Sequence, residues 1–178
     1  MVGATLTTTA AATIMLLVSN TAPDAPNASA TRTATVVLNG DINRVFPLFG
    51  FLEEAKWSRG WDPQVVALGA SLQDSVFTVT DNGVTATWIV AEYDEHQHRA
   101  TYAVFVPNSR AVTIRITCTS EGAKTRAQVM YTMVSLGENG VAALRNFEQQ
   151  DFAKRLEHWQ HAIDHYLETG KQWKGDSH

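Results

Sequence analysis

The last third of the chain contains a proline-free stretch, from Asn139 to Thr169, that is long enough to cross a whole sheet as a helix. Its one glycine, Gly140, lies at the start, and Gly170 follows as a typical helix stop. About thirty residues of helix extend about 45 Å at about 1.5 Å per residue. A step of about 100° per residue predicts one apolar stripe along it, made of Phe152, Leu156, Trp159, Ile163 and Tyr166.

The segment before this helix consists of short runs rich in β-branched and aromatic residues. Turn sequences such as the Asp-Asn-Gly at 81–83 separate them, as in β-hairpins. Residues 112–119 alternate between apolar and polar side chains, which indicates a sheet with one covered face and one solvent face. We expect strands at residues 33–39, 64–70, 75–80, 84–93, 99–107, 111–120 and 124–136.

Two short helices are expected between the first two strands, at 42–49 and 52–58. Pro47 keeps the first of them short. The order of elements is therefore one strand, two short helices, six strands and one long helix. This order predicts an α+β protein with the helix-grip fold, in which a curved antiparallel sheet of about seven strands wraps around the C-terminal helix.

The first thirty residues differ from the rest of the chain. They contain no Lys or Arg, an apolar run from Ala10 to Val18, and a small-residue end at 28–30. This pattern predicts a signal-peptide-like leader, and the run is too short to span a bilayer. The alternative is a disordered tail. We therefore assign 1–30 to the leader or tail, 31–172 to the folded domain and 173–178 to a C-terminal tail. The protein is exported to the periplasm or secreted if the leader is a signal peptide, and cytoplasmic otherwise.

Charge and motif content exclude several functional classes. The formal net charge of −4 provides no basic surface for nucleic acid. The one cysteine, Cys118, cannot form an intramolecular disulfide. There is no nucleophile elbow, glycine-rich phosphate loop or zinc spacing, so we predict no cofactor. The histidines His158, His161 and His165 project away from the apolar stripe, so we predict no metal site there. The sequence leaves the oligomeric state open.

Several motifs carry a resemblance to a known family. They are Phe-Pro-Leu-Phe at 46–49, Glu53 or Glu54, Trp-Ser-Arg-Gly-Trp-Asp-Pro at 57–63, Thr-Trp-Ile-Val at 87–90, and His-Trp at 158–159. Together they are similar to bacterial members of the START-like superfamily, also called SRPBCC, which includes birch-pollen-allergen proteins and polyketide cyclases. The resemblance covers about residues 32–170. It implies an apolar cavity between the sheet and the long helix that holds a hydrophobic small molecule or lipid.

The candidate ligand-binding residues follow from that cavity and from strand and helix periodicity. Val79, Val90, Val104 and Ile114 share the same inward face of the sheet. The alternative is that these side chains fill a solid core. The candidates are Trp57 and Trp61 at the mouth, Phe77, Trp88, Tyr102, Ile116, Tyr131 and Met133 on the sheet, and Arg145, Glu148, Phe152, Leu156 and Trp159 on the helix.

The polar candidates have two interpretations each. Counted back from Phe152, Arg145 and Glu148 fall near the inward stripe, where they orient a polar group of a ligand. Alternatively they form an ion pair along the helix. Glu53 and Glu54 either help to close the mouth of the cavity or are solvated acids at a helix start.

The sequence therefore favours a non-enzymatic carrier or sensor of a hydrophobic small molecule or lipid. A polyketide cyclase- or dehydratase-like enzyme is the alternative, with Arg145, Glu148, Tyr102 and Tyr131 as candidate acid–base groups. A third hypothesis is an interaction module similar to Hsp90 activators, with exposed aromatic residues on the convex outer face of the sheet or at the helix ends.

Overall fold

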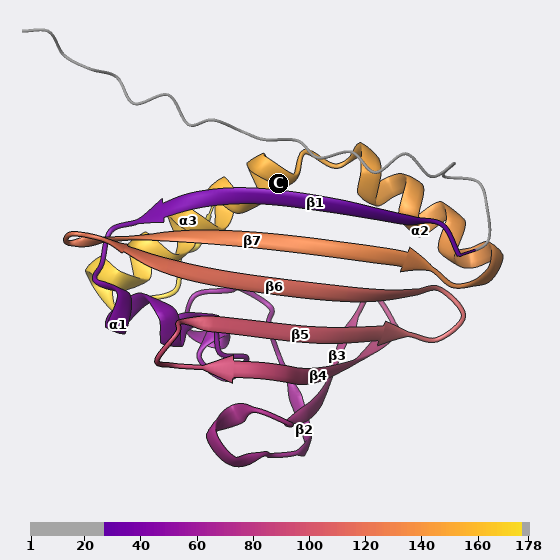
Figure 1. Cartoon of the computed structure of the whole chain (residues 1–178), viewed down its shortest axis with the longest axis horizontal. Coiled ribbons are helices and arrows are strands. Elements are labelled where there is room, and N and C mark those ends of the chain that lie inside the picture. Colours follow the sequence, from indigo (N-terminus) through magenta and orange to yellow (C-terminus); the bar gives the residue numbers. More distant parts are fainter. Residues whose placement is uncertain (1–26, 176–178) are drawn as a thin grey trace, which may run out of the picture.

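The computed structural model describes residues 27–175, and the predicted leader up to residue 26 lies outside the described residues. One antiparallel sheet has the order β1-β7-β6-β5-β4-β3-β2 (Figure 1). The predicted strands are confirmed, most of them to within a few residues at each end. Their bounds are β1 Ser29–Leu38, β2 Gln64–Ala67, β3 Val76–Asp81, β4 Val84–Asp94, β5 Arg99–Val106, β6 Arg110–Glu121 and β7 Lys124–Ser135.

The first strand pairs with the last, which joins the two ends of the domain. In this pairing Ser29 lies opposite Val134 and Leu38 lies opposite Thr125. The first strand thus begins two residues before the predicted domain boundary. Its partner β7 pairs on its other edge with β6, so the sheet continues without interruption to the short edge strand β2.

Short helical turns connect β1 to β2 on the inner side of the sheet. They are α1 Ile42–Val45, η1 Phe46–Phe49 and η2 Glu54–Lys56, and η3 Ala70–Leu72 follows β2. Asp41 starts α1, because its carboxylate accepts a hydrogen bond from the Asn43 amide at 3.1 Å. Two indole N–H groups fix the segment that follows: Trp57 donates to the Leu48 carbonyl and Trp61 to the Phe51 carbonyl, both at 2.7 Å.

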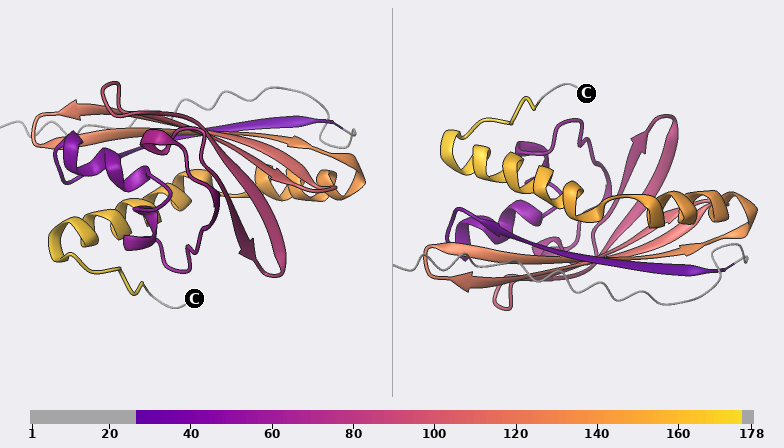
Figure 2. Two further views of the ribbon diagram at one scale, coloured as in Figure 1. Left: turned by 90° about the horizontal axis from the view of Figure 1, so that it is seen from below. Right: turned by 90° about the horizontal axis from the view of Figure 1, so that it is seen from above.

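The C-terminal helix is present, but it consists of two segments rather than one. They are α2 Gly137–Gln149 and α3 Phe152–Thr169. The break occurs because Asp151 caps α3, its side chain accepting a hydrogen bond from the Lys154 amide at 3.0 Å. Gly170 ends α3 in the left-handed conformation, as predicted. Figure 2 shows that both segments lie on the same side of the curved sheet as the short N-terminal helices.

The break changes the helical phase between α2 and α3, and with it the orientation of the Arg145 and Glu148 side chains. The buried residues of α2 are Gly140, Leu144 and Phe147. Arg145 is exposed, and Glu148 is half-buried with its backbone carbonyl accepting a hydrogen bond from Arg32. An unbroken helix in phase with Phe152 would point both side chains toward the cavity. With the break, neither residue lines it.

The inner face of the sheet is apolar and the outer face is mixed, as the alternation in β6 predicts. Val112, Ile114, Ile116 and Cys118 are buried there. Burial raises the pKa of the Cys118 thiol to about 12, so it stays protonated at neutral pH. On α3 the buried residues Phe152, Leu156, Ala162 and Ile163 face this surface and complete the core.

Candidate functional site

A cavity of about 180 Å³ lies between the inner face of the sheet and α3. The segment at 54–61, strands β4 to β7 and helix α3 each contribute to its wall. Seven of its lining side chains are aromatic or aliphatic, which is typical of a site for small organic molecules. The lining residues are Glu54, Ser58, Trp61, Trp88, Tyr102, Ile114, Ile116, Tyr131, Arg155 and Trp159.

Aromatic rings in fixed orientations build one wall of the cavity. Trp61 and Trp88 are nearly perpendicular, with ring centroids 5.3 Å apart. Phe77 is fully buried and stacks on Trp88, with ring centroids 5.6 Å apart. Tyr102 is held by its hydroxyl, which donates a hydrogen bond to the Phe49 carbonyl at 2.7 Å. Because these rings support one another, the wall is a preformed surface.

Glu54 places a carboxyl group in this apolar surrounding. It comes from the short turn η2, and its side chain is half-buried where it faces the cavity. Burial raises the pKa of Glu54 to about 8, and the positive charge of Arg155 partly opposes this rise. At neutral pH the carboxyl group is therefore predominantly protonated and can donate a hydrogen bond.

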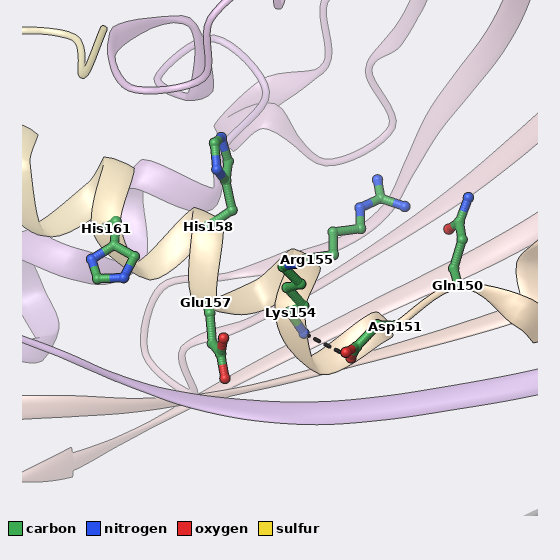
Figure 3. A pocket seen from close by; sticks show the side chains of 7 residues that line it. All are labelled: Gln150, Asp151, Lys154, Arg155, Glu157, His158 and His161. Atoms are coloured by element: carbon green, nitrogen blue, oxygen red, sulfur yellow. Dashed lines mark hydrogen bonds between the residues drawn. The ribbon is translucent and has the colours of Figure 1, made fainter. Parts of the chain in front are cut away.

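Arg155 connects the cavity to the protein surface. Its guanidinium carbon lies 5.2 Å from the Tyr131 ring centroid and 5.8 Å from that of Trp159. It also lines an open depression of about 680 Å³ on the outside of α3, where it projects to the opposite side of the helix from Glu157 (Figure 3). Arg155 thus marks the mouth of the cavity. The depression is lined by Gln150, Asp151, Lys154, Arg155, Glu157, His158 and His161.

The indole N–H of Trp88 is the other unusual polar group. It is buried and has no hydrogen-bond partner within residues 27–175. A buried donor without a partner is costly, and natural proteins rarely leave one unsatisfied. Its position in a cavity-lining residue makes it a candidate for interaction with a bound molecule.

A C-terminal strap, residues 171–175, holds the segment that carries Glu54. The Gln172 side-chain amide donates to the carbonyls of Ala55 and Ser58, both at 3.1 Å. The Trp173 ring packs against His158 and His161, with centroid distances of 4.9 and 5.9 Å. The strap therefore ties η2 to the outer side of α3, and those two histidines serve as its contact surface.

The predicted site residues separate into three groups in the structure. One group lines the cavity, a second packs in the surrounding core, and a third lies on α2. Trp57 belongs to the core group, because it is buried and its ring meets that of Trp159 edge to face, with centroids 5.6 Å apart. Arg145 and Glu148, on α2, form a group away from the cavity. Trp61, Trp88, Tyr102, Ile116, Tyr131 and Trp159 line the cavity, whereas Trp57, Phe77, Met133, Phe152 and Leu156 belong to the surrounding core.

Glu54, Ser58 and Arg155 line the cavity but are not among the ligand-binding residues that the sequence predicts. Glu54 was considered for the mouth, but its burial depends on how the short turn folds under α3. Arg155 follows Phe152 by three residues and precedes Trp159 by four, a spacing that places it beside the apolar stripe. That spacing was the available signal for Arg155.

Across residues 27–175, no group of three or more His, Cys, Asp or Glu side chains is arranged to hold a metal ion. In the same range, no helix combines the length and apolar character needed to cross a membrane.

Solved structures share the whole fold at low sequence identity. Ara h 8.0201 superposes with a TM-score of 0.59 and 14% identity, covering 80% of this chain and 99% of that chain. A START superfamily protein from Mycobacterium smegmatis gives 0.58 and 16%, covering 79% and 99%. The Zhui aromatase/cyclase from Streptomyces sp. R1128 gives 0.58 and 12%, covering 79% and 94%. No protein-family model and no curated protein sequence matches the chain.

The architecture and the internal cavity define a helix-grip protein. The similar structures show that the chain has the START-like, or SRPBCC, fold, and the resemblance predicted from the tryptophan motifs is confirmed at that level.

Proposed function

We propose that this protein binds a hydrophobic small molecule in the cavity between the sheet and α3, as a carrier or sensor. The observation that carries the proposal is the space of about 180 Å³ bounded by Trp61, Trp88, Tyr131 and Trp159. An apolar cavity of about 150 Å³ is sufficient to bind benzene. The volume therefore favours a compact molecule of one or two rings over a complete lipid.

Native mass spectrometry of the purified protein tests this function. We expect a bound species on the untreated protein, or on protein incubated with toluene. Ile116→Phe narrows the cavity and should reduce that occupancy, whereas Thr117→Val, on the exposed side of the same strand, should not. An unoccupied protein that also fails to take up toluene would contradict the proposal.

A cyclase- or dehydratase-like enzyme is the second candidate, and Glu54 is the observation that favours it. A carboxyl group with a pKa of about 8 inside a cavity is suited to general acid–base catalysis near neutral pH. Glu54 lines the cavity, whereas Glu148 lies on α2 away from it. Glu54 therefore replaces Glu148 as the candidate acid–base group. The structurally similar Zhui protein is named as an aromatase/cyclase, which supports this second candidate.

The test of the enzymatic candidate is the pH profile of turnover on an identified substrate. Glu54→Gln should abolish the step and remove a titration near pH 8, while Glu53→Gln should leave both unchanged. If the Glu54→Gln enzyme turned over its substrate normally, the acid–base role would be rejected.

The interaction module is supported by one exposed aromatic residue. Phe105 is 48% exposed on the outer face of β5, beside exposed Ile89 on β4. A chaperone pull-down that depends on Phe105 would support this function, and equal recovery with Phe105→Ser would reject it.

We also propose that the protein is exported, because its first thirty residues have the pattern of a signal peptide. The predicted cleavage after Ala30 would remove Ser29 and Ala30 from β1, where they pair with Val134 and Met133 of β7. A mature N-terminus ahead of β1 is therefore the form that preserves the sheet. Mass measurement of protein recovered from secreting cells tests this, and an intact Met1 in all fractions would contradict export.

A further inference from the structure

The polar groups of the cavity share one property, which is that they donate hydrogen bonds. The Arg155 guanidinium and the Trp88 indole have donors and no acceptor. Glu54 joins them at neutral pH, because burial raises its pKa to about 8. The hydroxyls of Ser58 and Tyr131 can also donate. A ligand that supplies only donors or a positive charge would leave the N–H groups of Arg155 and Trp88 without partners.

Glu54 and Arg155, the two donors at the mouth of the cavity, do not form an ion pair with each other. The ion pairs found within residues 27–175 are those of Lys56, Arg99 and Arg126, and none of them involves Glu54 or Arg155. Arg155 instead lies over the rings of Tyr131 and Trp159. Glu54 and Arg155 nevertheless line the same cavity.

We propose that the preferred ligand is a small planar aromatic molecule carrying an oxygen acceptor, a carbonyl or a carboxylate, directed toward Glu54 and Arg155 at the mouth of the cavity. This inference rests on the proposed binding function and adds the chemistry of the ligand. The aromatic part packs against Trp61, Trp88 and Trp159, where ring–ring contact gives large area with few rotatable bonds. The oxygen accepts from the protonated Glu54 carboxyl group and from Arg155.

Binding should therefore depend on pH through Glu54. The charged or titratable groups that face it are Arg155 from α3, Tyr131 from β7 and Tyr102 from β5. Burial raises the pKa of Tyr131 to about 12 and that of Tyr102 further, so both stay neutral over the relevant range. Between pH 6.5 and 9.5 Glu54 loses its proton and changes from a donor to an acceptor that repels an oxygen.

Matched aromatic probes test this inference on the full chain by calorimetric titration. Acetophenone and benzoate carry the acceptor, toluene lacks it, and benzylamine replaces it with a cationic donor. At pH 6.5 we expect acetophenone and benzoate to bind about tenfold more tightly than toluene, with benzylamine weakest, as for one or two added hydrogen bonds. At pH 9.5 the advantage of acetophenone over toluene should fall at least severalfold.

Two variants isolate the role of Glu54. Glu54→Gln keeps a donor that does not titrate, so acetophenone should retain its advantage over toluene at pH 9.5. Glu53→Gln alters the neighbouring acid, which pairs with Lys56 outside the cavity, and should behave like the original protein.

The outcomes separate this inference from the function on which it rests. Equal binding of toluene and acetophenone at both pH values, or tighter binding of benzylamine, overturns the acceptor preference and leaves hydrophobic binding intact. Failure of every probe to bind overturns both proposals.

Discussion

The guanidinium carbon of Arg155 lies 5.2 Å from the centroid of the Tyr131 ring, at the point where the internal cavity meets the surface depression on α3. This cation–π contact holds the positive charge of an exposed helical residue against an aromatic wall. From there Arg155 lowers the pKa of Glu54 against the larger, opposite effect of burial. Burial and the charge of Arg155 therefore together determine the protonation state of Glu54.

Arg155→Met tests this relationship because it removes the charge and keeps a long side chain. The pKa of Glu54 should rise above about 8, since only the desolvating effect of burial remains. Carbon-detected NMR of the glutamate carboxyl groups over pH 5–10 measures it. Lys154→Met removes the neighbouring charge and should have a smaller effect. A Glu54 pKa that stayed constant or fell in Arg155→Met would contradict the assignment.

Glu54 should also make stability depend on pH. The folded chain keeps this proton up to about pH 8, whereas an ordinary glutamate loses it near 4.5. The folded state thus binds more protons between these values, and its contribution to the free energy of unfolding falls as pH rises through that window.

Glu54→Gln should remove this part of the decline. Because the side chain is half-buried, we expect a relative gain of about 1–3 kcal/mol at pH 9 compared with pH 5, less than the full shift would give. Urea unfolding at pH 5, 7 and 9 measures the free energies, with Glu53→Gln as the control. Parallel pH dependence of Glu54→Gln and the original protein would refute this origin of the effect.

The sequence predicts most of the sheet because hairpin turns and alternation are local signals. Residues 112–119 alternate as the buried pattern of β6 does, and Gly170 ends α3 as expected. The helix break at 150–151 was missed because the span contains no proline or internal glycine, and Asp151 acts as a cap only through its own side chain. The helix phase, and with it the placement of Arg145 and Glu148, depended on that one residue.

The candidate site was harder to predict than the fold for a physical reason. Periodicity shows which face of an element is inward, but it does not separate a side chain that lines a cavity from one that packs in the core. Trp88 and Phe77 face inward in adjacent strands, yet Trp88 lines the cavity and Phe77 packs behind it. The raised pKa of Glu54 arises from contacts distant in sequence, which no local pattern encodes.

Gly140 permits a close approach between α2 and the sheet. A Cβ atom at this position would lie 2.0 Å from the Ser109 carbonyl oxygen and 2.9 Å from the Ser135 Cα. Gly140→Ala should therefore destabilise the protein by about 1–3 kcal/mol, although alanine is the better helix former by about 1 kcal/mol. Chemical unfolding measures this, with exposed Asn139→Ala as the control. Unchanged or increased stability would show that the approach is less close than described.

The C-terminal strap should control the mobility of the segment that carries Glu54. Gln172→Ala removes the hydrogen bonds to the Ala55 and Ser58 carbonyls. Amide hydrogen exchange at residues 53–58 should become several times faster, because these local contacts hold the turn closed. Exposed Lys171→Ala should leave the exchange unchanged. Equal protection of residues 53–58 in both variants would show that the strap does not hold this turn closed.

The central claim is that the space bounded by Trp88, Tyr131 and Trp159 receives a small apolar molecule. Methyl NMR of the isoleucine-labelled protein during titration with toluene tests it most directly, because Ile114 and Ile116 line the cavity while Ile89 is exposed on the outer face. We predict saturable shifts of the Ile114 and Ile116 methyl signals with Ile89 unchanged. Shifts confined to Ile89, or no saturable shift at Ile114 and Ile116, would contradict the account.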